Sequence, residues 1–364
     1  MKRFFAGMTA ALLAVILVFS FPAHGISAKS AIVKDCTTGR ILYERNADKR
    51  SLIASTTKIM TALLICEKCN VLDRMQIPKE AVGIEGSSIY LKAGEILTIQ
   101  DLLYGLMLHS GNDAAVALAI YCAGTIEEFA QMMNDKARVL GMKNTNFENP
   151  NGLDSPNHYS TAEDLSILAA YAMENPIFEK IVSTKNVKIG QRYLKNHNKL
   201  LWQLEGADGV KTGYTRNAGR ILVSSAKRNG RRLVAVTIDD PDDWSDHINL
   251  LESGFMNYTE REIICKGDVL GVLEIAGGQQ NDVCLIANES FAYALAQGET
   301  PQIYLPSPGF VYAPVVENQY AGYAMIYLGE EWIGKIPIAY GQTIEQNIQQ
   351  PSNFWERLLG GANE

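Results

Sequence analysis

Residues 54–65 have the sequence ASTTKIMTALLI, a run of apolar and helix-favouring residues with a polar start. Ile59 and Leu63 recur at the spacing of one helical face, so the run is predicted to be a helix that packs into a core. Ser55 begins this helix, and Lys58 follows three residues later. Residues three apart on a helix project from the same side, so we expect the hydroxyl and the amine within reach of each other.

A hydroxyl beside an amine is a pair that can support nucleophilic catalysis. A serine hydroxyl is a poor nucleophile until a neighbouring base accepts its proton. Lys58 can be that base only if its amine is neutral, and burial or a second cation nearby would disfavour the ammonium form. Taken alone the pair is a weak indication, because most Ser-x-x-Lys pairs are a helix cap beside a solvated lysine.

Two further motifs strengthen this interpretation. Ser110-Gly111-Asn112 separates two apolar helical runs, so it is predicted to lie on a helix-to-helix turn. Lys211-Thr212-Gly213 lies in a β-like run at 210–214. Together, in this order, the three motifs are the signature of penicillin-binding proteins and class A β-lactamases.

The order of the remaining elements indicates a sheet covered by helices. Two short strands near the N-terminus are predicted to form a hairpin, and Asn229-Gly230 marks the tip of another. Thr98 is predicted to cap one helix, and Ser160-Thr161-Ala162-Glu163 to begin another. The predicted strands are 30–35, 41–44, 210–214, 221–226 and 233–238, and the predicted helices are 54–65, 98–107, 114–121, 126–140, 160–173 and 245–258.

The C-terminal part of the chain differs in pattern from the central unit, 29–258. Short apolar strands separated by Gly, Asn and Pro predict a small all-β domain at 259–345. The tail, 346–364, carries aromatic and leucine residues, and both a weak amphipathic membrane contact and a frayed end are compatible with it.

The N-terminus has the pattern of a secretory signal peptide, assigned to residues 1–28. Two basic residues precede an apolar stretch from Phe4 to Phe21, which a proline and small residues follow. Cleavage after Gly25 and cleavage near Ala28 both fit the pattern. An uncleaved anchor is the alternative, because the run approaches the ~18 residues that span a bilayer. Export is therefore expected.

Composition excludes several classes of function. A net charge of −7 with scattered basic residues argues against a nucleic-acid partner. The five histidines form no H-E-x-x-H pair, and no G-x-S-x-G elbow occurs, which disfavours a metallopeptidase and an α/β-hydrolase. No metal or cofactor is expected.

The cysteines show no dense disulfide framework. Cys66-Glu67-Lys68-Cys69 is a lone C-x-x-C without a second pair at zinc spacing, so a structural zinc site is disfavoured. Small buried side chains are the default interpretation. The six cysteines are Cys36, Cys66, Cys69, Cys122, Cys265 and Cys284.

The chain resembles the low-molecular-mass penicillin-binding proteins, the serine D-Ala-D-Ala carboxypeptidases of peptidase family S11. The stretches that carry the resemblance are 54–62, 110–115, 149–153 and 208–215. It implies a mixed α/β (α+β) fold of DD-peptidase and β-lactamase type, with an antiparallel sheet flanked by helices. It also implies a peptidoglycan stem peptide as substrate, β-lactams as covalent inhibitors, and a place in the cell wall or at the outer face of the cytoplasmic membrane.

The resemblance implies catalytic roles for four residues. Ser55 attacks the carbonyl of the penultimate D-Ala, and water later hydrolyses the acyl-enzyme. Lys58 accepts the proton of Ser55, and Ser110 relays it toward the departing amine. Asn112 hydrogen-bonds the bound peptide and helps to hold Lys58.

The same resemblance implies that the strand at 210–214 binds the substrate. Lys211 supplies positive charge that keeps Lys58 neutral and attracts the terminal carboxylate, and Thr212 is a second carboxylate contact. Gly213 lets the substrate lie against the strand. The backbone amides of Ser55 and Tyr214 form the oxyanion hole.

One segment departs from the family pattern near the carboxylate pocket. Some members carry an arginine there, whereas here Asn196-His197-Asn198 precedes Lys199-Leu200-Leu201-Trp202. His197 in that role would make carboxylate binding depend on pH near neutrality. The alternative is that His197 is a surface residue and that Arg216 or Lys211 suffices.

Three other functions are alternatives to the carboxypeptidase. A class A β-lactamase needs a Glu-x-x-Leu-Asn pattern, which residues 140–180 lack, and it has no extra β-domain. A DD-endopeptidase that cuts cross-links would use the same active site and stays open. A non-catalytic wall-binding protein is disfavoured because every reactive position is present.

Overall fold

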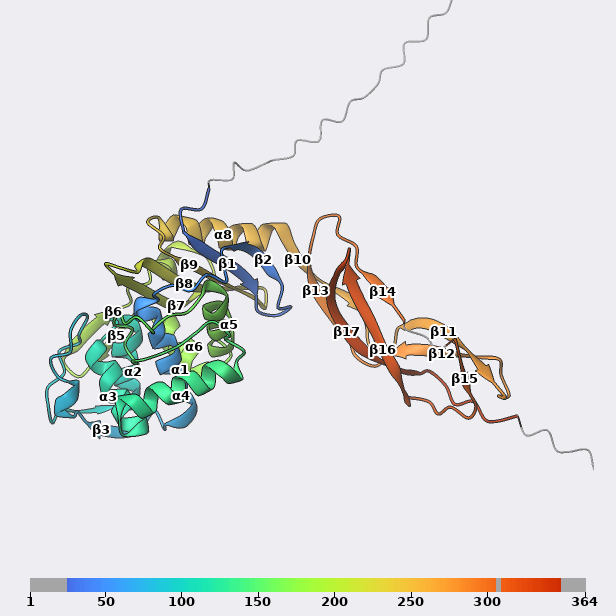
Figure 1. Cartoon of the computed structure of the whole chain (residues 1–364), viewed down its shortest axis with the longest axis horizontal. Coiled ribbons are helices and arrows are strands. Elements are labelled where there is room, and N and C mark those ends of the chain that lie inside the picture. The colour runs from blue at the N-terminus through green and yellow to red at the C-terminus, as the bar shows by residue number, and fades with distance from the viewer. Residues whose placement is uncertain (1–24, 306–308, 348–364) are drawn as a thin grey trace, which may run out of the picture.

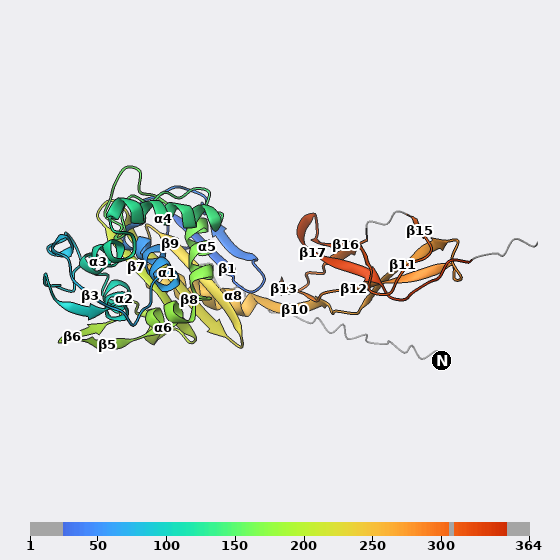
Figure 2. The same cartoon turned by 90° about the horizontal axis from the view of Figure 1, so that it is seen from below.

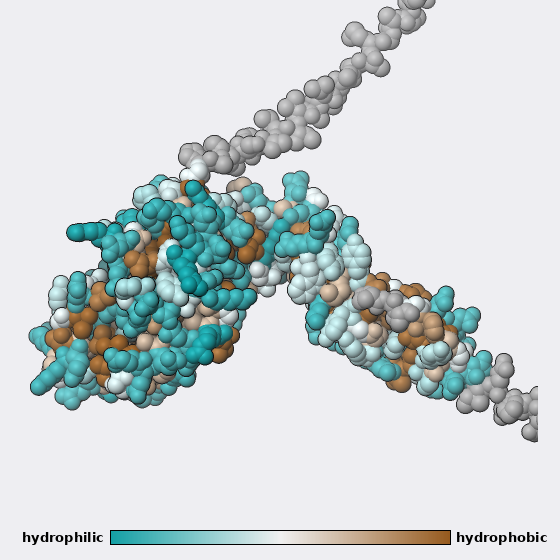
Figure 3. Space-filling view, in the orientation of Figure 1, coloured by the Kyte–Doolittle hydropathy of each residue, from teal (hydrophilic) through white to brown (hydrophobic). Residues whose placement is uncertain are grey.

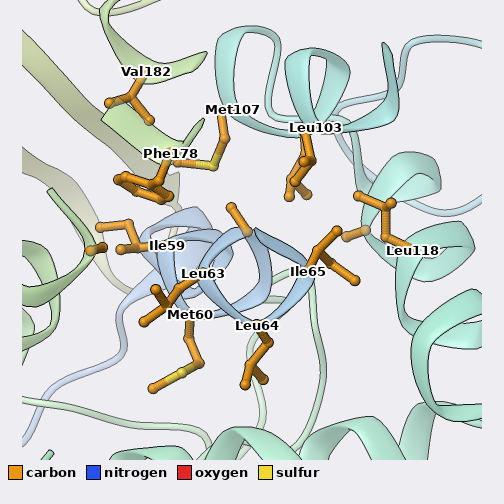
Figure 4. Packing of buried hydrophobic residues seen from close by; sticks show 14 of the residues in the cluster. Ile59, Met60, Leu63, Leu64, Ile65, Leu103, Met107, Leu118, Phe178 and Val182 are labelled. Atoms are coloured by element: carbon orange, nitrogen blue, oxygen red, sulfur yellow. The ribbon is translucent and has the colours of Figure 1, made fainter. Parts of the chain in front are cut away.

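The predicted core helix forms in two pieces in the computed structural model, which describes residues 25–305 and 309–347. A 3-10 turn, η1 (Ala54–Thr57), leads into α1 (Lys58–Lys68). Ser55 therefore lies on the tighter turn, and Lys58 is the first residue of the α-helix. Figure 4 shows α1 surrounded by apolar side chains, with Phe178 beside Ile59 and Leu118 on the side of Ile65.

A five-stranded antiparallel sheet forms the middle layer, as predicted, in the order β2-β1-β9-β8-β7. The hairpin tip is at Asn229 and Gly230, both with positive φ, as this tight turn requires. β7 is an edge strand and carries the Lys-Thr-Gly motif. The strands are β1 (Ser30–Asp35), β2 (Ile41–Arg45), β7 (Ala207–Thr215), β8 (Gly219–Arg228) and β9 (Arg231–Ile238).

Helices cover both faces of this sheet (Figures 1 and 2). Alternate strand residues point to opposite sides, so Ile32 and Val234 join the core around α1, while Val33 and Leu233 pack against α8. The helices besides α1 are α2 (Ile99–Leu108), α3 (Asn112–Ala123), α4 (Ile126–Val139), α5 (Ala162–Ala172), α6 (Pro176–Ser183), α7 (Leu200–Gln203) and α8 (Asp243–Asn257).

Of two predicted helix starts, one is confirmed and the other is displaced by one residue. Thr98 caps α2 in a reciprocal capping box with Asp101, as predicted. The cap of α5 is Thr161, whose hydroxyl accepts from the Asp164 backbone N–H, and not Ser160. The prediction was wrong by one residue because Ser160 and Thr161 are both competent caps.

Several short elements were not predicted. They are α6, α7, the turn η2 (Lys79–Ala81) and two small hairpins, formed by β3 (Arg74–Gln76) with β4 (Ile96–Thr98) and by β5 (Asn186–Ile189) with β6 (Arg192–Lys195).

From Tyr258 onward, within the described residues, the structure consists of strands with a separate core. Buried Val283, Ile326 and Ile336 belong to that core. A six-stranded sheet has the order β14-β16-β17-β12-β11-β15, in which β11 and β15 pair in parallel, and β10 pairs with β13. The bounds are β10 (Tyr258–Ile264), β11 (Val269–Ala276), β12 (Asp282–Ala287), β13 (Phe291–Ala296), β14 (Gln302–Tyr304), β15 (Phe310–Tyr312), β16 (Tyr320–Leu328) and β17 (Glu331–Tyr340).

The predicted signal segment and tail lie mostly outside the described residues. Ser27, however, is bound into the fold, because its hydroxyl lies 2.6 Å from an Asp240 carboxylate oxygen and its backbone N–H donates to Asp246 at 2.6 Å. Ala28 is fully buried. Across 25–305 and 309–347, no helix has the length and apolarity to span a bilayer. Figure 3 shows hydrophilic residues over most of the visible surface, with apolar patches on both parts.

Candidate active site

The three sequence motifs meet at one cavity of about 350 Å³. Ser55 enters it from η1, Ser110 from the turn between α2 and α3, and Thr212 from β7. Gly213 and Tyr214 also line the cavity, while Lys58 and Lys211 are buried behind it. The other lining residues are Ser87, His197, Lys199, Arg220, Asp243 and Trp244.

The Lys58 amine is held by three oxygen atoms. Its Nζ lies 2.9 Å from Ser55 Oγ, 2.7 Å from Asn112 Oδ1 and 2.5 Å from the Asn151 carbonyl oxygen. A neutral amine has two N–H donors and one lone pair. Since Asn112 Oδ1 and the Asn151 carbonyl can only accept, they take the two N–H groups, and the lone pair is left for the Ser55 hydroxyl.

The surroundings of Lys58 favour this neutral form. Burial lowers the pKa of Lys58 well below its usual value, the charge of Lys211 lowers it further, and Asp113 opposes the shift. Burial also lowers the pKa of Lys211, to about 7. The second cation that the sequence suggested is thus present, but desolvation is the larger cause.

Asn112 is fixed so that its amide oxygen faces Lys58. Its Nδ2 donates to the Glu85 carbonyl at 2.5 Å, and its backbone N–H donates to the Ser87 carbonyl at 2.7 Å. Ser110, two residues earlier, is buried and has a φ of 62°, a left-handed conformation that non-glycine residues rarely adopt. The turn thus directs both side chains of the motif into the site.

The loop Asn149–Leu153 is part of the site through its backbone. Besides the Asn151 carbonyl on Lys58, the Pro150 carbonyl accepts from Thr61 Oγ1 at 2.7 Å. Gly152 has a φ of +85°, and a Cβ there would overlap the Ala54 carbonyl next to Ser55. The sequence predicted only a loop here, since backbone carbonyls leave no mark in side-chain identity.

Replacing Gly152 by alanine is expected to cost at least about 2 kcal/mol of folding free energy and to slow acylation at least about tenfold. The left-handed backbone and the overlap with Ala54 both oppose the methyl group. Denaturant unfolding and the rate of labelling by a fluorescent penicillin measure the two effects. Gly141→Ala is the matched control, because Gly141 has a φ of +77° but open space around it. Equal effects at both positions would contradict the steric argument.

A buried histidine is hydrogen-bonded to η1, the turn that contains Ser55. His158 Nδ1 accepts from the Glu148 backbone N–H at 3.0 Å, so Nε2 carries the proton and donates to Thr57 Oγ1 at 2.7 Å. Burial lowers the pKa of His158 to about 4, so the ring is neutral near pH 7. No sequence motif pointed to a role for His158.

His197 lines the cavity and is therefore not a plain surface residue, but its pKa does not favour a titration near neutrality. Burial, the charge of Lys211 and the nearby His109 lower its pKa to about 4. The two histidine rings have centroids 4.7 Å apart. His197 is therefore neutral at pH 7 and does not titrate near neutrality in the free protein.

Arg220 lines the cavity and was not found from the sequence, whereas Arg216, which is also exposed, is not among the lining residues. Arg220 donates to both Asp243 carboxylate oxygens, at 2.7 and 2.9 Å, and lies over Trp244. It faces Tyr214 across the β7–β8 pair. Only the strand register, which the motif alone does not give, brings it to the cavity.

Comparisons with known proteins agree with this arrangement. The family model for D-alanyl-D-alanine carboxypeptidase matches residues 18–242, and that for the penicillin-binding protein 5 C-terminal domain matches 258–346. The D-alanyl-D-alanine carboxypeptidase DacF of Bacillus subtilis is 32% identical and covers 86% of this chain and 84% of its own length. DacB2 of Mycobacterium tuberculosis is 34% identical over 65% of this chain and 85% of its own length.

Solved structures give the same result. Penicillin-binding protein 5 of Haemophilus influenzae superposes with a TM-score of 0.76 at 30% identity, covering 88% of this chain and 98% of that one. The family model spans more than half of the chain, and the cavity contains its motifs. The chain therefore belongs to the D-alanyl-D-alanine carboxypeptidase family, the S11 peptidases.

Proposed function

We propose that this protein is a penicillin-binding serine D-alanyl-D-alanine carboxypeptidase that removes the terminal D-Ala from peptidoglycan pentapeptide stems. The observation that carries the proposal is the 2.9 Å contact between Ser55 Oγ and the buried Lys58 amine, whose other two partners are hydrogen-bond acceptors. This contact supports Ser55 as nucleophile and Lys58 as its base.

Acylation begins when Ser55 Oγ attacks the carbonyl carbon of the penultimate D-Ala. The hydroxyl proton moves to Lys58 Nζ as the new C–O bond forms. Negative charge then develops on the carbonyl oxygen, for which the backbone amides of Ser55 and Tyr214 are the proposed donors. The close approach of Gly213 to Thr56 supports this pairing, since an added Cβ would lie 3.3 Å from the Thr56 nitrogen.

The C–N bond then breaks and the terminal D-Ala leaves. Its amine takes the proton from Lys58, with Ser110 at the cavity wall as the proposed relay. Water then attacks the acyl carbonyl and gives a proton to Lys58 Nζ, and this proton passes to Ser55 Oγ as the C–O bond breaks, which frees Ser55 and releases the shortened peptide. A β-lactam would follow the first half of this path and remain as a covalent adduct on Ser55.

The test is mass spectrometry of a pentapeptide muropeptide incubated with the purified protein. Loss of one alanine is expected, while a matched peptide ending in D-Ala-L-Ala should stay intact. Cleavage confined to cross-linked dimers would contradict the carboxypeptidase assignment and favour an endopeptidase. Absence of both turnover and labelling by a fluorescent penicillin would favour a non-catalytic wall-binding protein.

Arg220 is the proposed partner of the substrate's terminal carboxylate, together with Thr212. Arg220 lines the cavity and its side chain is partly exposed, so a ligand can reach its guanidinium. Lys211, in contrast, is buried, and its Nζ donates to the Thr212 carbonyl at 2.7 Å. Its guanidinium, already paired on one side with Asp243, can present its remaining donors to an anion.

Arg220→Ala is expected to lower kcat/KM for the pentapeptide about tenfold, mainly through KM, because a charge-assisted hydrogen bond to the substrate is lost. Its partial exposure keeps the effect at this level. Arg216→Ala is the matched control and should leave kcat/KM nearly unchanged. A larger effect at Arg216 than at Arg220 would contradict the assignment.

Export across the cytoplasmic membrane, with residues 1–25 removed, is also proposed. Ser27 and Ala28 support cleavage after Gly25, because a cut near Ala28 would remove the Ser27 contacts with Asp240 and Asp246. The mass of the secreted protein tests this, with Ile26 as the expected first residue. A mature chain that begins at Lys29 would contradict it.

A further inference from the structure

Three cysteines gather at the ends of two helices, away from the cavity. Cys66 is in the last turn of α1 and is buried, and Cys69 follows α1 as its C-cap. Cys122 is in the last turn of α3, and both Cys69 and Cys122 are half-buried. Both thiols are free in the structure and influence each other's pKa. Next to them the Tyr121 hydroxyl donates to an Asp73 carboxylate oxygen at 3.1 Å, which brings the end of α3 against the segment that follows α1. The spatial partner of Cys69 is thus Cys122, which the C-x-x-C motif did not suggest.

These two helices are the ones that carry the catalytic groups at their other ends. α1 begins at Lys58 and α3 begins at Asn112, and the 2.7 Å hydrogen bond from Lys58 Nζ to Asn112 Oδ1 joins them. The helices therefore run in the same direction, joined at their first residues by the Lys58–Asn112 hydrogen bond and near their C-terminal ends by the Tyr121–Asp73 hydrogen bond.

We propose that Cys69 and Cys122 form a disulfide that clamps the C-terminal ends of α1 and α3. Such a bond needs an oxidising compartment, so the proposal rests on the proposed export. The cross-link would restrict sliding of α3 against α1, which is the motion that would pull Asn112 away from Lys58.

Cys122 is the better attacking thiol of the cluster. The hydrogen bond from Cys69 and the charge of Lys68 lower the pKa of Cys122 to about 7, against the effect of burial. The same hydrogen bond, together with burial, raises the pKa of Cys69. Burial raises the pKa of Cys66 to about 12, which makes it a poor nucleophile.

The oxidant is a disulfide, either that of an oxidised dithiol-disulfide oxidoreductase or that of oxidised glutathione. The Cys122 thiolate attacks one sulfur of that disulfide, forms a mixed disulfide and releases one thiol. Cys69 then loses its proton and attacks the Cys122 sulfur, which releases the second thiol. Two protein thiols are oxidised, and one external disulfide is reduced to two thiols.

The test uses the chain from Ile26 onward, incubated with oxidised glutathione, alkylated and digested without reduction. A peptide containing Cys69 linked to one containing Cys122 is expected, with the other four cysteines alkylated. Reduction should lower the Tm by roughly 5 °C or more, because the bond closes a long loop in the unfolded chain. Cys69→Ser and Cys122→Ser should each lose the link and the response of Tm to reduction. Cys66→Ala is the matched control and should keep both.

Two results would overturn the proposal: alkylation of all six cysteines after the oxidising incubation, or a link between Cys66 and Cys69. Its failure is distinguishable from failure of the proposed function. Labelling by a fluorescent penicillin should persist in Cys69→Ser, since this residue lies at the opposite end of α1 from Ser55. Absence of labelling in the wild type would count against the carboxypeptidase and leave the disulfide result standing.

Discussion

Ser55→Ala is expected to abolish covalent labelling by a fluorescent penicillin and to lower kcat/KM for the pentapeptide at least about 10⁴-fold. Without Oγ no acyl-enzyme can form, so only binding and the oxyanion donors remain to assist attack by water. The fold should survive, because Ser55 is only half-buried. The substitution removes the contact of its hydroxyl with the Lys58 amine. Gel fluorescence and intact mass after incubation with benzylpenicillin measure the loss, and the Tm checks the fold.

Ser87→Ala is the matched control for this experiment. Ser87 also lines the cavity, but its carbonyl, and not its hydroxyl, holds the Asn112 backbone. Labelling of this variant should remain within a few-fold of the wild type. Retention of an adduct in Ser55→Ala, mapped to a peptide containing Ser110, would contradict the assignment of the nucleophile.

The parts of the fold that could be predicted are those whose cause is local in the sequence. The Asn229-Gly230 turn fixes a hairpin because both positions need a positive φ. Thr98 and Asp101 define the start of α2 by their own hydrogen bonds. Elements with a weak sequence pattern were not predicted. The strands of the β5–β6 hairpin have only four residues each, too few for an alternating pattern to be recognised.

The site divides in the same way. Side chains whose proposed roles rest on their own chemistry, Ser55, Lys58 and Asn112, were found from motifs, and hydrogen bonds to the Lys58 amine bring them together. The Asn151 carbonyl on Lys58 could not be found, because every residue has a carbonyl group. The role of Arg220 depends on its register opposite Tyr214, and the lowered pKa of His197 depends on burial and on the nearby Lys211. Tertiary structure alone supplies such information.

The pH dependence of the free energy of unfolding follows from the same buried lysine. Between its lowered folded pKa and its usual value near 10.4, Lys58 binds a proton in the unfolded chain but not in the folded one. The free energy of unfolding therefore increases as pH rises through this window. Lys211, with a pKa of about 7, adds to the slope.

Lys58→Arg is expected to lower the acylation rate by a fluorescent penicillin roughly 10³-fold. A guanidinium stays protonated at any pH compatible with folding, so it cannot accept the Ser55 proton. Because Lys58 is fully buried, the larger side chain can also disturb packing, and Lys58→Met is the second variant. Methionine fills a similar volume without a base and should be equally slow.

The two variants separate the base from a merely structural lysine. In the wild type the acid limb of the acylation rate should lie far below the usual pKa of lysine, since burial and Lys211 keep the amine neutral. Lys58→Met should lack this limb and should show a smaller rise of Tm with pH. A methionine variant that acylates within tenfold of the wild type, with the acid limb unchanged, would mean that another group takes the Ser55 proton. The amine would then serve only to position Asn112 and the 149–153 loop.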